Sequence, residues 1–144
     1  MIDRSLMFSV LMSLKPQYCQ RILDGVKTVE IRKTIPTLKP PFKVYMYCTK
    51  NKGTDNILKI GSGRKKNKGN GFIVGEFTCD GYTFDEAPYN KLVEGSTLNN
   101  DELMDYGKKV RLAGWHIKDV VVYNKPKELK ELGATRAPQS WCYV

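Results

Sequence analysis

The apolar segments of this chain are short, and prolines, glycines or polar runs separate them. None of them approaches the roughly 18 apolar residues that a membrane-spanning helix needs, so no membrane association is expected. With 144 residues, 41% of them hydrophobic, the chain is long enough to bury a core as one domain over residues 1–144. Short segments can build such a core only by packing many strands and short helices together.

Alternation of apolar and polar residues predicts six or seven short strands. They are expected at Met7–Leu14, Thr28–Lys33, Phe42–Cys48, Phe72–Cys79, Val110–Ala113, Trp115–Tyr123 and Ser140–Val144. Gly75 is a candidate β-bulge, and the polar stretches Thr49–Asn70 and Asp80–Thr97 are expected to be loops. So many short strands favour a closed or nearly closed mixed β-barrel of the α+β class.

Two or three short helices are expected outside this barrel, at residues 16–24, 99–107 and 125–132. Pro16 suits the first turn of a helix, where its missing N–H is not needed, and Gly25 suits the position just past the end. Asn99 or Asn100 can cap the second helix, whose first turn carries two acidic residues.

The predicted strand after Gly25 carries charge on one face. Because side chains alternate along a strand, Val29 and Ile31 share one face, and Glu30 and Arg32 share the other. The carboxylate and the guanidinium then lie about 7 Å apart along the strand, with Lys27 just before it. Charges of both signs on so short a strand exceed what solubility needs, so these residues form the candidate site.

Each of these side chains has a plausible role in binding or catalysis. Arg32 can hold a phosphate or a base edge through two parallel hydrogen bonds. Glu30 can orient Arg32, accept a hydrogen bond from a base amino group, or serve as a general base. Lys27 can hold a phosphate or, when desolvated, act as a base. The structural alternative is an ion pair of Glu30 with Arg32 or Lys27 that anchors the barrel.

Positive charge is concentrated in the first half of the chain. The net charge is +9, but residues 1–68 hold 15 basic and 4 acidic side chains, a net charge of +11. Such segregation favours a polyanionic partner, although a lysine-rich composition can also serve solubility alone. The segment with Arg64, Lys65, Lys66 and Lys68 can follow a phosphate backbone, or it can be a solvated loop tip.

Other chemistries find little support in the sequence. The glycine-rich stretch lacks the spacing of a phosphate-binding or dinucleotide-binding loop, and a GxSxG elbow is absent. The four cysteines (Cys19, Cys48, Cys79 and Cys142) have no zinc-site spacing, so we expect free thiols in a reducing cytoplasm and neither a metal nor a cofactor. His116 is expected to be an ordinary structural histidine.

Three short stretches between residues 13 and 32 resemble the ASCH domain family of the PUA-like superfamily. They are Ser13–Pro16, Ile22–Gly25 and Gly25–Arg32. The family signature is GxKxxExR, and Gly25, Lys27, Glu30 and Arg32 fill its four defined positions. The ending at residues 136–144 resembles the close of small phage or prophage proteins in this group, which suggests a phage origin.

The resemblance implies a PUA-like β-barrel whose cleft binds RNA or nucleotides, with Lys15, Lys27, Glu30 and Arg32 as ligand-binding residues. Some small members are amidohydrolases that deacetylate acetylated cytidine, and others are linked to RNA cleavage. If this chain is such a hydrolase, Lys27 and Glu30 are its expected catalytic residues. In the deacetylase type a threonine stands where this chain has Glu30, and Glu102 is a candidate for a further glutamate. A phage module that binds an acidic protein is the remaining alternative.

Overall fold

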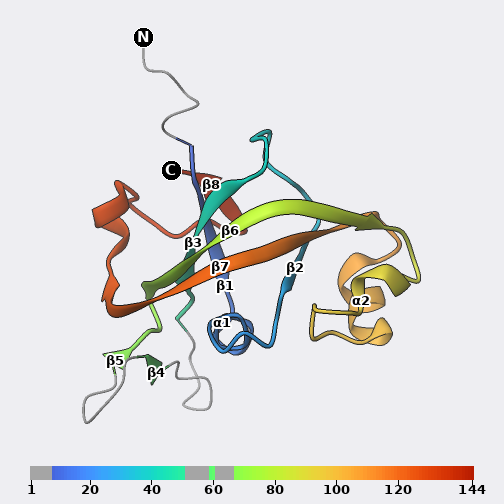
Figure 1. The fold of residues 1–144 in the computed structure, drawn as a ribbon, viewed down its shortest axis with the longest axis horizontal. Helices are drawn as coiled ribbons and strands as arrows, with labels where there is room; N and C mark the ends of the chain where they lie inside the picture. Colours follow the sequence, from blue (N-terminus) through green and yellow to red (C-terminus); the bar gives the residue numbers. More distant parts are fainter. Residues whose placement is uncertain (1–7, 51–58, 61–66) are drawn as a thin grey trace.

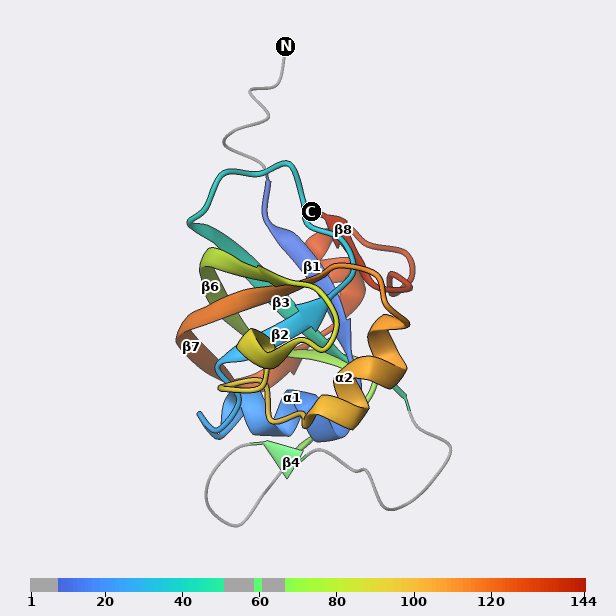
Figure 2. The same cartoon turned by 90° about the vertical axis from the view of Figure 1, so that its right-hand side faces the viewer.

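The computed structural model describes residues 8–50, 59–60 and 67–144 (Figure 1). Its main sheet has six strands in the order β2-β7-β6-β3-β1-β8. Their bounds are β1 Val10–Leu14, β2 Val29–Arg32, β3 Phe42–Cys48, β6 Phe72–Asp85, β7 Leu112–Lys127 and β8 Trp141–Tyr143. The pair β1–β3 is parallel and the other pairs are antiparallel. The sheet curls into a half-barrel (Figures 1 and 2), so the expected mixed β-barrel of the α+β class is confirmed.

Two α-helices lie at the same end of the barrel, α1 (Pro16–Leu23) beneath β1 and α2 (Asn100–Gly107) beyond β2 (Figures 1 and 2). Within the described ranges, no helix is both long enough and apolar enough to span a membrane. The described residues also form two 3₁₀ turns, η2 (Asn90–Leu92) and η3 (Leu129–Leu132).

The helix ends form as their sequences predict. Pro16 occupies the first turn of α1, and Gly25 follows the helix with a left-handed φ of 77° that suits glycine. Asn99 caps α2 in a reciprocal arrangement, because its side chain accepts from the Glu102 N–H while the Glu102 carboxylate accepts from the Asn99 N–H. These caps fix where each helix begins and ends beside the barrel.

The alternation predicted for β2 decides what lies on each side of this strand. On one face, Ile31 packs against Leu92 and Leu103, which belong to η2 and α2. On the other face, Glu30 and Arg32 point toward the main barrel core, whose buried members include Val10, Met12, Val44, Met46, Phe77 and Trp115. The strand therefore separates an apolar cluster under α2 from a charged pair inside the barrel.

The two longest strands extend beyond their predicted ends. The loop expected from Asp80 is wrong for its first residues, because β6 continues to Asp85 and pairs Tyr82 and Phe84 with β7. The break expected at Gly114 is also wrong, since β7 runs through it. A Cβ at Gly114 would lie 2.7 Å from the Val29 side chain, so the glycine permits close packing of β2.

The remaining predictions near the ends of these strands had mixed outcomes. The bulge expected at Gly75 is confirmed, since Met46 pairs with Gly75 and Tyr47 with Ile73, which leaves one extra residue. The helix expected over 125–132 is wrong in its first half, because β7 continues to Lys127 and only a 3₁₀ turn follows. β2 pairs only with residues 113–116 of β7, so among the described strands the end of β7 pairs with β6 alone, and a strand with a free side tolerates proline.

The stretch expected as the loop Thr49–Asn70 contains a small antiparallel ladder. Its strands are β4 (Lys59–Ile60) and β5 (Asn67–Lys68). Of the predicted basic segment, Arg64, Lys65 and Lys66 lie outside the described residues. Lys68 belongs to β5 by its backbone.

Gly107 offers a test of how α2 is held. A Cβ at this position would lie 2.3 Å from the Tyr89 hydroxyl, and Tyr89 is fully buried and donates to the Val110 carbonyl. We therefore expect Gly107→Ala to lower the free energy of unfolding by about 2 kcal/mol, despite alanine's helix propensity. Urea denaturation measures the change. Gly81→Ala is the matched control, because its Cβ would meet its nearest neighbour at 3.6 Å; equal stability of the two variants would contradict this packing.

Candidate functional site

A pocket of about 520 Å³ opens at the end of the barrel where β1, β2, α1 and α2 meet. Four of its residues are the ligand-binding residues expected from the sequence, Lys15, Lys27, Glu30 and Arg32. Its other lining residues are Ser13, Leu14, Tyr18, Ile31, Thr49, Leu98, Glu102, Asp105, Tyr106 and Gln139. The fold thus gathers the four residues in one cavity, and their use of it remains a prediction.

Lys27 reaches the pocket because the chain turns sharply after α1. With Gly25 in the left-handed conformation, the N–H groups of Val26 and Lys27 both donate to the Arg21 carbonyl, at 2.9 and 3.0 Å. The next two N–H groups donate to the carbonyl of Gly95, at 2.8 and 3.0 Å. These bonds fix the short segment between α1 and β2, so the Lys27 side chain points inward rather than into solvent.

The Lys27 ammonium is 1% exposed and has contacts on several sides. Its Nζ donates to the Ser96 carbonyl, lies 3.5 Å from Glu30 Oε1, and sits 5.3 Å from the centre of the Tyr18 ring. Burial lowers the pKa of Lys27 from its ordinary value of 10.5, and the Glu30 carboxylate opposes that shift. Lys27 is therefore easier to deprotonate than a surface lysine.

Glu30 lies between two cations. Its Oε2 is 2.7 Å from Arg32 Nη2 and 2.9 Å from Arg32 Nε, while Oε1 faces Lys27. Glu30 pairs in register with Trp115 of β7, and opposed residues of antiparallel strands project to the same face. The carboxylate therefore rests beside a fully buried indole, in an environment where its hydrogen bonds are strong.

Arg32 directs most of its hydrogen bonding to the protein. Nη2 donates to the Ser13 carbonyl at 2.8 Å, and Nη1 lies 3.1 Å from Ser140 Oγ and 3.3 Å from its carbonyl. Together with Glu30, these contacts occupy all three guanidinium nitrogens. They join β2 to the end of β1 and to the residue before β8. This arrangement favours a positioning role for Arg32, and direct ligand contact by its guanidinium stays a prediction.

The rim of the pocket carries both signs of charge. Lys15 is exposed at the end of β1, while Glu102, Asp105 and Tyr106 come from one face of α2. Sequence analysis missed Asp105 and Tyr106 as pocket residues. Their spacing of three and four residues from Glu102 predicts a shared helix face, but only packing shows that this face borders the site. Lys33 lies 4.9 Å from the Tyr106 ring centre and extends the charged rim.

Other polar candidates lie elsewhere in the fold. His116 is in β7, where its Nε2 lies 2.7 Å from the Thr83 hydroxyl, and it does not line this pocket. Cys19, Cys48, Cys79 and Cys142 are free thiols. In the part of the chain that the structure describes, no three histidine, cysteine or acidic side chains gather as they would around a metal ion.

Glu30→Gln tests whether this carboxylate organises the site. The change keeps the side-chain shape but leaves the buried Lys27 and the largely buried Arg32 without their counter-charge, so we expect the free energy of unfolding to fall by about 3 kcal/mol. Chemical denaturation at neutral pH measures the loss. In the matched control Glu128→Gln, the pair with Lys130 is 53% and 80% exposed, and we expect a change below about 1 kcal/mol. Similar losses in both variants would refute the role given to Glu30.

Lys27→Met tests the lowered pKa through its effect on stability. Between the lowered pKa of the folded state and the unfolded value of 10.5, the unfolded chain binds more protons at this group. Stability of the parent protein relative to the variant should therefore rise as the pH rises through that window. Denaturation of both proteins at pH 7 and pH 10 measures this difference, with Lys15→Met as control for an exposed ammonium. A difference that is constant with pH would contradict the shift.

No family model matches the sequence of this chain. No curated protein matches it by sequence either.

Nine chains of solved structures match the fold, including three of ASCH from Zymomonas mobilis. The crystal structure of ASCH from Zymomonas mobilis has 19% identity and a TM-score of 0.70, and the match covers 94% of this chain and 86% of that one. A tyrosine-to-phenylalanine mutant of that protein has 18% identity and a TM-score of 0.72, with 94% and 88% covered. A serine-to-alanine mutant has 17% identity and a TM-score of 0.69, with 94% and 87% covered. The barrel and its helices therefore have the ASCH-domain fold.

Proposed function

We propose that this chain is a cytoplasmic protein that binds RNA or a modified nucleotide in the pocket around Lys27, Glu30 and Arg32. The observation that carries the proposal is a buried, hydrogen-bonded charge cluster at the wall of a cavity of about 520 Å³. Ligand sites in proteins combine such a volume with a few fixed polar groups. Desolvated charges are costly to keep, and they concentrate where function requires them.

The polar groups match the edge of a nucleobase. Glu30 Oε1 can accept a hydrogen bond from an exocyclic amino group, and Lys27, 3.5 Å away, can donate to a neighbouring carbonyl or ring nitrogen. Cytosine and adenine present such an amino group beside an acceptor. The rings of Tyr18 and Tyr106 line the same pocket and offer surfaces for stacking. A site of this kind rejects bases that leave either buried group unpaired.

The charge around the pocket supports a nucleotide rather than a neutral base. Lys15 is exposed at the rim, where its ammonium can meet a phosphate group. The first 68 residues carry a net charge of +11, which raises the local concentration of polyanions. Glu102 and Asp105 on the opposite rim favour a ligand that also offers hydrogen-bond donors, such as ribose hydroxyls or base amino groups.

A second candidate function is hydrolysis, and the state of Lys27 favours it. Burial lowers the pKa of Lys27, and its Nζ lies beside the Glu30 carboxylate, so this pair can transfer protons. The substrate would be a modified nucleoside, such as acetylated cytidine, or RNA itself. In the first case water adds to the acetyl carbonyl and the amine leaves with a proton. Glu102, exposed at the rim, is within the same pocket.

The test is a titration of the protein with cytidine, acetylated cytidine and short single-stranded RNA, followed by calorimetry and by mass spectrometry of the ligand. We expect binding that weakens at least about tenfold in Lys27→Met, because a buried charged hydrogen bond is lost. Lys43→Met is the matched control, since Lys43 is half-exposed and pairs with Glu76 outside the pocket.

Each outcome decides between the candidates. Binding with an unchanged ligand supports the binding function, whereas loss of an acetyl group or cleavage of RNA supports the hydrolase. Unchanged affinity in Lys27→Met would show that the pocket is not the binding site. Failure to bind any of the three ligands would overturn the proposal.

A further inference from the structure

A second cavity of about 530 Å³ has a lining that shares no residue with the first and takes no part in the site described above. Its floor is formed by the sheet, and the turn η3 with the segment after it forms one wall. The lining residues are Tyr47, Lys50, Asn70, Gly71, Phe72, Glu128, Leu129, Lys130, Ala134 and Thr135. Like the first pocket, it combines aromatic rings with exposed cations.

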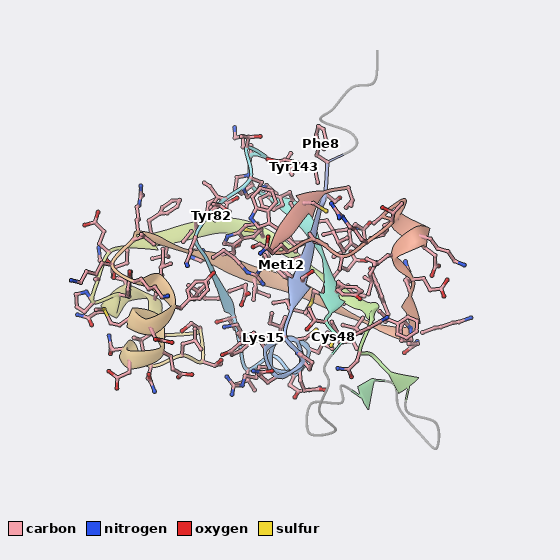
Figure 3. All side chains as sticks on the ribbon, turned by 180° about the vertical axis from the view of Figure 1, so that it is seen from behind. Phe8, Met12, Lys15, Cys48, Tyr82 and Tyr143 are labelled. Atoms are coloured by element: carbon pink, nitrogen blue, oxygen red, sulfur yellow. The ribbon has the colours of Figure 1, made fainter. Side chains whose placement is uncertain are left out.

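The pairing of β1 with β3 places a lining residue of each cavity on neighbouring strands. These strands run parallel, with Ser13 in register with Tyr47 and Leu14 with Cys48. Ser13 lines the first cavity and Tyr47 the second, and neighbouring strands lie about 4.8 Å apart. Figure 3 shows Lys15 and Cys48 beside each other where the two strands end. The linings of the two cavities therefore come close at the ends of these two strands.

The chain forms the boundary between the cavities at two places. Thr49 lines the first cavity and the next residue, Lys50, lines the second. On the opposite side, Gln139 lines the first cavity and Thr135 the second, four residues earlier in the same segment. The Thr49 N–H donates to the Leu14 carbonyl at 3.0 Å, which holds this boundary against the end of β1. The linings of the two cavities therefore include the adjacent residues Thr49 and Lys50.

The charged and aromatic side chains of the two cavities indicate the chemical class of a ligand that would occupy both. Lys15 is exposed at the first cavity, and Lys50 and Lys130 are exposed at the second, where Lys130 also pairs with Glu128 at 3.0 Å. Phe72 is partly exposed beside Tyr47 in the second cavity. Cations that follow a path past successive aromatic rings are the chemistry that binds a single nucleic-acid strand, with phosphates on the lysines and bases on the rings.

We propose that the second cavity is a subsite for the neighbouring nucleotide of a single-stranded oligonucleotide whose recognised base occupies the first cavity. This inference rests on the proposed function and specifies its ligand as a strand rather than a free nucleoside. The strand crosses Thr49, its linking phosphate lies between Lys15 and Lys50, and the neighbouring base stacks against Phe72. A duplex does not fit this arrangement, because its bases are paired and stacked with each other.

The experiment compares a nucleoside with a tetranucleotide of the same recognised base, using the parent protein and the double variant Lys50→Gln/Lys130→Gln. We expect the tetranucleotide to bind more tightly than the nucleoside, and the double variant to lose about tenfold for the tetranucleotide and nothing for the nucleoside. The dependence of log affinity on log salt should fall by about 0.7 for each phosphate contact removed. Lys118→Gln, an exposed β7 lysine outside both cavities, is the matched control.

A tetranucleotide with an abasic neighbour on each side of the recognised base tests the stacking without altering the protein. We expect it to bind at least about fivefold more weakly than the intact strand. Nucleoside binding with no gain from the longer strand, or a double variant with unchanged tetranucleotide affinity, would overturn the subsite and leave the proposed function standing. Tighter binding of a duplex would also overturn it. Failure of the nucleoside and of every strand to bind would instead overturn the proposed function.

Discussion

The contact of Arg32 with Glu30 holds together parts of the chain that lie far apart in sequence. The two residues project from one face of β2, and the guanidinium also binds the end of β1 and the residue before β8. Lys27 completes the cluster from the turn after α1. Lys27 and Glu30 are buried and the Arg32 side chain is only 11% exposed, so removing Glu30 would leave uncompensated charge in the barrel. The pocket has its shape because these strands and the turn meet at this cluster.

The same cluster explains why one motif can serve both structure and function. A buried ion pair is a poor way to gain stability, since desolvation offsets most of the Coulomb attraction. Here the Glu30–Arg32 contact satisfies the guanidinium, while Glu30 Oε1 and the Lys27 ammonium remain beside the cavity. The structural and functional interpretations of the sequence are therefore compatible: Arg32 fixes the carboxylate, and the fixed carboxylate and ammonium line the cavity.

Much of this fold could be predicted from local patterns. The caps at Gly25 and Asn99 follow from backbone chemistry within a few residues, and the bulge at Gly75 from the absence of a side chain. The extensions of β6 and β7 could not be predicted, because their polar and proline-containing ends are stabilised by pairing with each other. Strand length depends on a partner that is distant in sequence, and a local window does not contain it.

For the site, the sequence alone determined which charges share one face of β2, because the alternation of side chains along a strand is a local property. The sequence also determined that helix α1 ends at a turn through Gly25, two residues before Lys27. Only the tertiary structure decided that Lys27 is buried against Ser96 and Tyr18, that α2 supplies the opposite rim, and that Thr49 and Lys50 line different cavities. Burial and cavity shape arise where distant segments pack, and the free energy of that packing depends on contacts between residues far apart in the chain.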